Sequence, residues 1–271
     1  MTLSRIGLLA ALVVVFAGCG YPELFEDQGT LQPPQTGITR LELDTGNGYV
    51  RVTRVDDSVG IAIAYTRRAH GRSRADAEEH INDVVISHQV VDGVLKVKAE
   101  WPEGARSYGC DFNVQMNMRI PVDVRTSNGL IAVANTDAQA ALETSNGPIE
   151  VTGTSGATTA RSSNGAVRFT GHRGPLEVRT SNAPVTCAVD VLIPTDAVTL
   201  TTSNSSVTLN IPADTQADFD ATTSNAEVTV AGFPNISYSR TEREHKSGTI
   251  NGGGANVTLS TSNARIDING E

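Results

Sequence analysis

The chain has 271 residues and a formal net charge of −9, with 4% aromatic and 19% charged residues. The acidic balance argues against a nucleic-acid-binding protein, because such a protein carries a concentrated basic surface. Three cysteines are too few for a disulfide scaffold. The 30 threonines, 25 glycines and 17 asparagines are instead typical of a β-rich repeat protein.

Residues 1–18 have the features of a secretory signal peptide. A single arginine precedes 13 apolar or glycine residues at 6–18, a run shorter than the roughly 20 residues of a membrane-spanning helix. The run ends in Phe16-Ala17-Gly18-Cys19, which resembles the lipobox of bacterial lipoproteins, although that family usually begins the motif with Leu, Val or Ile. The resemblance implies that Cys19 becomes a lipid-modified first residue. The alternative is an ordinary cleaved signal peptide with an incidental cysteine.

Residues 19–38 follow as a polar segment with three prolines and no helical or strand periodicity. We therefore expect a flexible tether between the lipidated Cys19 and a folded domain. Gly20, rather than Asp, follows the cysteine. In lipoprotein sorting this implies the outer membrane.

The rest of the chain is governed by a repeat built around Ser-Asn-Gly-like corners. From Asn128 onward the first five Asn-to-Asn spacings are 18, 18, 18, 22 and 21 residues, and a degraded copy stands near Ser247. The corner asparagines are Asn47, Asn128, Asn146, Asn164, Asn182, Asn204, Asn225 and Asn263. A repeated spacing of this size indicates stacked structural units.

Apolar residues alternate on both sides of each corner. They occur three and five residues after the asparagine, as at Ile149/Val151, and six and four residues before it, as at Val122/Val124. This is the periodicity of strands with one buried face. We therefore predict an all-β fold, a parallel β-solenoid of about eight or nine short rungs. Its corner asparagines should form a hydrogen-bonded ladder, and we attribute their recurrence to the tolerance of Asn for positive φ.

The combination of lipobox and repeat resembles the bacterial domains of the DUF4097 type, a family of candidate adhesins. The resemblance covers about Thr39 to Ile268 and rests on Ile120-Pro121 before the Val122–Gly129 segment and on the repeated Ser-Asn-Gly-x-Ile-x-Val turns. It implies a β-solenoid in the cell envelope or on the cell surface. It transfers no catalytic residues.

An elaborated segment interrupts the repeat in the region 39–125, which otherwise contains the first rung. We predict a strand at 59–66, a short helix at 73–83 with Ser73 as its N-cap, a hairpin at 84–101 around Asp92-Gly93, and a returning strand at 112–120. We expect this α+β part to cover the first rung, because solenoid ends otherwise expose strand edges. The repeat solenoid proper is placed at 126–271.

The remaining candidate residues have simpler interpretations. Cys110 and Cys187 could pair in an exported protein, but Cys187 occupies an inward repeat position, so we expect no disulfide. The arginines at 67–74, with His70, could meet anionic groups, but we favour a solvated loop neutralised by nearby acids. The five histidines match no metal spacing. We expect no metal and no cofactor.

Three functional hypotheses from different classes remain. The first is a non-catalytic, lipid-anchored envelope protein that binds or scaffolds through a surface ligand, glycan or protein. The second is a carbohydrate-active enzyme, for which Glu143, Glu150, Glu177 and Glu227 are the regularly placed carboxylates. The third is a self-assembling structural protein that stacks through its ends. Because no catalytic motif is present, we expect no enzyme, and the first hypothesis is favoured.

Overall fold

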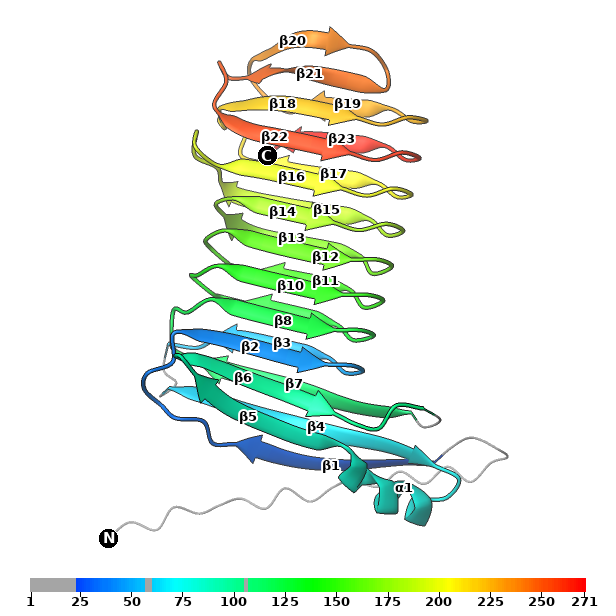
Figure 1. The fold of residues 1–271 in the computed structure, drawn as a ribbon. Helices are drawn as coiled ribbons and strands as arrows, with labels where there is room; N and C mark the ends of the chain where they lie inside the picture. The colour runs from blue at the N-terminus through cyan, green and yellow to red at the C-terminus, as the bar shows by residue number, and fades with distance from the viewer. Residues whose placement is uncertain (1–22, 57–59, 105–106) are drawn as a thin grey trace.

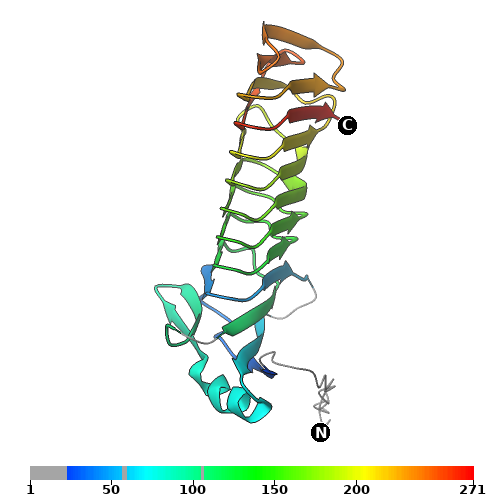
Figure 2. The same cartoon turned by 90° about the vertical axis from the view of Figure 1, so that its right-hand side faces the viewer.

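The computed structural model describes residues 23–56, 60–104 and 107–271. These residues form an elongated stack of short strands with a broader N-terminal end (Figures 1 and 2). The strands belong to an 11-stranded and a 12-stranded sheet, and the neighbours within the stack run parallel. The prediction of an all-β, parallel β-solenoid is confirmed.

Eight rungs each contain one strand of either sheet, joined by a Ser-Asn or Gly-Asn corner. In chain order these pairs are β2(Arg40–Thr45) with β3(Val50–Arg54), β8(Val122–Thr126) with β9(Ile131–Ala134), β10(Ala140–Thr144) with β11(Ile149–Thr152), β12(Thr158–Ser162) with β13(Val167–Arg173), β14(Leu176–Arg179) with β15(Val185–Val191), β16(Ala197–Thr201) with β17(Val207–Ile211), β18(Ala217–Thr222) with β19(Val228–Ala231), and β22(Ala255–Ser260) with β23(Ile266–Gly270).

The core lies between the two sheets and is filled by the alternating residues of every rung. Ile149 and Val151 in β11, for example, are at most 2% exposed, whereas Glu150 between them points to solvent. In-register parallel pairing places each inward residue on its equivalent in the next rung, as Ile149 lies on Val167. The weakest repeat copy also fits, because Thr158 and Ala160 are both buried.

The N-terminal elaboration continues both sheets beyond the first rung. It consists of β4(Ile61–Gly71), α1(Arg74–His80), the 3-10 turn η1(Ile81–Asp83), β5(Val85–Val91), β6(Val94–Glu100) and β7(Tyr108–Met116). β6 pairs with β2 and β7 with β3, so they form one further layer that covers the first rung. Ser73 caps α1, since its hydroxyl accepts a 3.2 Å bond from the Asp76 N–H. The boundary predicted between residues 125 and 126 falls inside β8. Both sheets continue from the N-terminal elaboration into the repeat without a break.

The tether predicted at 19–38 is wrong for much of its length. Glu23–Leu31 forms β1, which pairs antiparallel with β4 over nine residues and closes one edge of its sheet. Phe25 and Leu31 pack against the core. The sequence resembles a linker because most of its residues are polar, while only Phe25 and Leu31 of β1, with Tyr65 of β4 beside Gly29, supply the packing.

The rungs do not follow the order of the chain at the C-terminal end. β22 lies between β16 and β18, and β23 lies between β17 and β19, so the last rung in sequence fills a gap left by its predecessors. The segment near Ser247, predicted as a degraded corner, is part of β21(His245–Ile250). β21 pairs antiparallel with β18 and with β20(Ile236–Thr241). This hairpin ends the stack (Figure 1).

Candidate ligand-binding groove

The eight corner asparagines lie in one row along the stack. Seven side-chain nitrogens donate to the side-chain oxygen of the neighbouring rung, as from Asn146 to Asn128 and from Asn164 to Asn146, both at 2.7 Å, and that of Asn47 donates to the backbone oxygen of Tyr108. The row runs Asn47, Asn128, Asn146, Asn164, Asn182, Asn204, Asn263 and Asn225, in the spatial order of the rungs. Because these amides bond one another, their role is to hold the rungs in register.

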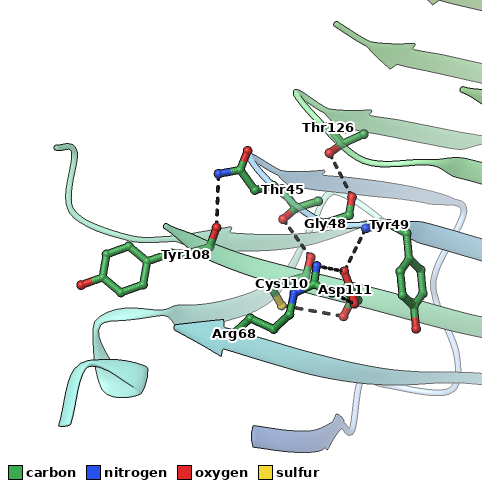
Figure 3. Close-up of polar contacts among 9 residues, drawn as sticks. Thr45, Gly48, Tyr49, Arg68, Tyr108, Cys110, Asp111 and Thr126 are labelled. Atoms are coloured by element: carbon green, nitrogen blue, oxygen red, sulfur yellow. Dashed lines mark hydrogen bonds and ion pairs between the residues drawn. The ribbon is translucent and has the colours of Figure 1, made fainter. Parts of the chain in front are cut away.

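A second, buried row explains the threonine or serine that precedes each corner. The Thr126 hydroxyl donates to the carbonyl oxygen of Gly48 at 3.1 Å, and the Thr45 hydroxyl donates to that of Cys110 at the same distance (Figure 3). Equivalent bonds recur at Thr144 and Ser162. Each hydroxyl thus satisfies a carbonyl that the corner turns away from the strand ladder.

The reason given above for the corner sequence needs correction. Positive φ among the described non-glycine residues occurs at Asp92, Asn135 and Asn251, and none of these is a corner asparagine. The corner glycines also have ordinary φ; a Cβ at Gly147 would lie 1.8 Å from the oxygen of Gly129 in the next rung. Glycine is favoured because stacked corners approach closely, and asparagine because its amide both donates and accepts.

Cys110 and Cys187 are free and fully buried. β7 and β15 are separated in their sheet by β3, β9, β11 and β13, which puts the two sulfurs about 24 Å apart at ~4.8 Å per strand. Burial raises the pKa of the Cys110 thiol to about 12 and raises the pKa of the Cys187 thiol further. Cys19 lies outside the described residues.

Two of the four arginines near His70 are paired with acids, and these acids are not the ones expected. Arg67 pairs with Asp27 of β1, and Arg68 pairs with Asp111 of β7 (Figure 3). Asp111 also accepts a 2.9 Å bond from the Tyr49 N–H, although burial outweighs these partners and raises the pKa of its carboxyl group. The two pairs tie β4 to its neighbours β1 and β7, and the Tyr49 bond to Asp111 joins β7 to the corner of the first rung, so Arg67 and Arg68 have a structural role.

A polar groove opens on the side of the stack opposite the asparagine row. It has a volume of about 290 Å³. It is lined by the turns opposite the asparagine corners in three consecutive rungs and by the end of β15: Asp137, Thr152, Gly153, Thr154, Ser155, Thr170, Gly171, Arg173 and Asp190. The groove forms where rung length changes. β9 and β11 have four residues each, whereas β13 and β15 have seven, so Asp190 projects beside the shorter rungs.

The charged groups of the groove differ in how they are held. Asp137 is fixed, since its carboxylate pairs with Arg54 at 2.5 Å and accepts a 3.1 Å bond from the Ser155 hydroxyl. Arg173 and Asp190 line the same groove. The backbone of Arg173 bonds Thr154 and Gly156, but neither side chain has a hydrogen bond or ion pair to another described residue. A guanidinium and a carboxylate are therefore both available to a ligand.

The floor of the groove is small and polar. Gly153 and Gly171 both have positive φ, at 59° and 68°, a conformation that favours glycine, so the backbone carries no side chain at these two positions. The hydroxyl groups of Thr152 and Thr170 border it. The lining side chains are Asp, Arg, Thr and Ser, with no aromatic ring among them, and such a lining suits a ligand rich in hydroxyl groups. The sequence predicted none of this, because the loop residues repeat only weakly and only their stacking brings them together.

His172 lies fully buried behind the groove. One ring nitrogen is 2.9 Å from the Thr154 hydroxyl, and the ring meets Phe169 edge to face with 5.5 Å between centroids. Burial lowers the pKa of this imidazole despite the carbonyl oxygen of Pro175 nearby. A neutral imidazole that bonds Thr154 stiffens the groove wall rather than touching a ligand.

The four regularly spaced glutamates do not converge. Glu143 and Glu177 lie on strands of one sheet, β10 and β14, whereas Glu150 and Glu227 lie in or next to β11 and β19 of the other. Hydrogen bonds from Arg161 and from Arg179 lower the pKa of Glu177. Glu177 is thus unsuited to act as a general acid, which needs a raised pKa.

The described residues contain neither a cluster of metal ligands nor a membrane-spanning helix. Groups of three or more His, Cys, Asp or Glu side chains able to hold a metal ion do not occur among them. Within the same ranges, every helix is too short or too polar to span a membrane.

Comparison with known proteins gives structural neighbours alone. No family model matches the sequence, and no curated protein matches it. A crystal structure of a candidate adhesin from Bacteroides fragilis aligns with 91% of this chain and 97% of its own, at 8% identity and a TM-score of 0.41. A candidate cell adhesion protein from Clostridium sporogenes aligns with 93% of this chain and all of its own, at 12% identity and a TM-score of 0.36.

Proposed function

We propose that this protein is an exported, lipid-anchored and non-catalytic envelope protein that binds glycans through the groove around Arg173 and Asp190. The observation that carries the proposal is the pair of unpartnered charges, one cationic and one anionic, beside threonine hydroxyls and bare glycine backbone. Charge-assisted hydrogen bonds to sugar hydroxyls are stronger than neutral ones. The four regularly spaced glutamates do not converge, which supports binding over turnover.

The anchor would stand at one end of the rod. Cys19 precedes β1 by four residue steps, so a lipid on it could hold the described part within about 14 Å of a membrane surface. β1 belongs to the N-terminal layer, and the groove lies on rungs further along the stack. This arrangement supports a rod whose groove lies several rungs along the stack from the lipid anchor.

Binding is tested with the double variant Arg173→Ala/Asp190→Ala and a matched control, Arg168→Ala. Arg168 is an exposed arginine of the same strand, β13, that does not line the groove. Both purified full-length variants are probed against a panel of polysaccharides and glycans. We expect the double variant to lose binding by about tenfold or more, since two charge-assisted contacts are removed, while the control binds normally. Equal binding by all three proteins, or binding to proteins alone, would refute the glycan groove.

The anchor is tested separately with Cys19→Ser. The wild-type protein should fractionate with outer membranes and label with a fatty acid, and the variant should do neither. A wild-type protein recovered entirely in soluble form would overturn the anchor without affecting the groove.

A further inference from the structure

The two sheets of the solenoid end in four edge strands, and three of them are protected against pairing with another chain. β1 carries Glu23, Glu26 and Asp27. β19 has four residues, and β20 has a register shift between Tyr238 and Arg240, where it also carries a charge. Charge, shortness and bulges are the devices by which natural edge strands avoid edge-to-edge association.

The fourth edge strand, β5, has none of these devices. Its sequence from Val85 to Val91 contains no proline and no Asp, Glu, Lys or Arg, and it pairs with β6 over seven residues without a register shift. Val85, Val90 and Val91 are 57%, 37% and 44% exposed. β5 is the last strand of its sheet, at the N-terminal end of the molecule (Figure 1).

The free edge of β5 presents backbone groups in a regular order. Asp92 and Gly93, both with positive φ, form a two-residue turn between Val91 and Val94. Antiparallel strands alternate between residues that bond their partner and residues that point away. Counting from the turn, Ile86, His88 and Val90 direct their N–H and C=O groups away from β6.

The sequence of β5 is complementary to itself about His88. In an antiparallel pair centred on this residue, Val85 faces Val91, Ile86 faces Val90, and Ser87 faces Gln89. Every apolar residue meets an apolar residue, on both faces of the strand, and the outward backbone groups of Ile86, His88 and Val90 meet their counterparts. Such cross-strand pairs of β-branched residues stabilise sheets.

We propose that two copies of this chain associate through β5, antiparallel and centred on His88. The contact is the same on both copies, so it closes after two and does not grow into a fibre. The 12-stranded sheet continues from one molecule into the other, and the two stacks extend in opposite directions. The β20–β21 hairpins lie at the far ends.

The first test places one cysteine at the centre of the contact in the full-length protein. The native Cys110 and Cys187 are fully buried and should not react with a short cross-linker. We expect His88→Cys to give a covalent dimer in intact cells, and Arg168→Cys, exposed on β13 away from every sheet edge, to give none. Absence of a dimer with His88→Cys, or equal dimer with both variants, would overturn the proposal.

The second test exchanges charges at the same position. Two full-length copies with different tags are co-expressed, and the fraction that co-purifies is measured. His88→Glu in both copies, or His88→Lys in both, sets like charges directly opposite each other and should reduce co-purification by about fivefold or more. His88→Glu with His88→Lys should restore it. Undiminished association of the like-charged pairs would overturn the proposed register. A monomer that captures an extended peptide through β5 would overturn the dimer in favour of strand addition from another protein.

Discussion

Single residues of this protein are determined mainly by what the neighbouring rung places against them. Gly147 must lack a Cβ because the oxygen of Gly129 would lie 1.8 Å from it. His172 occupies the position that Thr154 occupies one rung earlier, and the two side chains bond each other. Burial of His172 lowers the pKa of its imidazole. The stability of the groove wall should therefore depend on pH.

At the residue scale, His172 should make stability depend on pH in a defined direction. The unfolded histidine takes up a proton below about pH 6.5, whereas the folded one resists it until a lower pH. The free energy of unfolding should therefore fall as the pH drops from about 6.5 toward the lowered pKa of the folded state.

The check is chemical denaturation of the wild-type protein and His172→Gln at pH 7.5 and pH 5. We expect the loss of stability on acidification to be smaller in the variant, which keeps a polar group for Thr154 but does not titrate. An identical loss in both proteins would show that His172 contributes nothing to the pH dependence.

Elements of the solenoid depend on rows of equivalent contacts. A rung has two strands of about four to seven residues, too short to be stable alone. Its inward residues bury against the next rung, and its corner is tied by the asparagine row on the surface and by the threonine row inside. These rows explain why the corner sequence recurs while the opposite loops vary.

At the element scale, Asn146→Ala should destabilise the stack more than its neighbour Ser145→Ala does. The asparagine donates to Asn128 and accepts from Asn164, and each lost hydrogen bond costs about 0.5–1.5 kcal/mol. We expect a decrease of about 1–2 kcal/mol in the free energy of unfolding, measured by urea denaturation. Ser145 is exposed at the same corner, so Ser145→Ala should stay within about 0.5 kcal/mol. Equal effects would mean that the row carries no stability.

At the scale of the whole molecule, the last rung in sequence is inserted between two earlier rungs. β18 and β19 leave one position open above β16 and β17, and β22 with β23 fills it from the end of the chain. The last residues therefore tie the C-terminal hairpin to the stack.

At the scale of the molecule, a variant truncated after Gly254 should lose the folded structure of the residues that follow β17. Without β22 and β23, β19 loses its strand partner and β18 keeps only β21. Residues 212–250 are then no longer joined to the stack through strand pairing and should become sensitive to limited proteolysis, while residues 122–211 stay protected. Mass spectrometry of the fragments provides the measurement. If residues 212–250 remain protected, β18 has paired directly with β16 and the inserted rung is dispensable.

The sequence by itself determined the strands, their inward faces, the corner positions and the class of fold, because these depend on alternation and on a repeated local turn. It did not reveal β1, whose polar residues look like a linker, or the order of the last rungs, because every rung presents the same kind of edge to its neighbours. The groove and the exposed edge of β5 were also decided by tertiary structure. Both depend on which strands end beside one another, and neither spacing nor alternation contains that information.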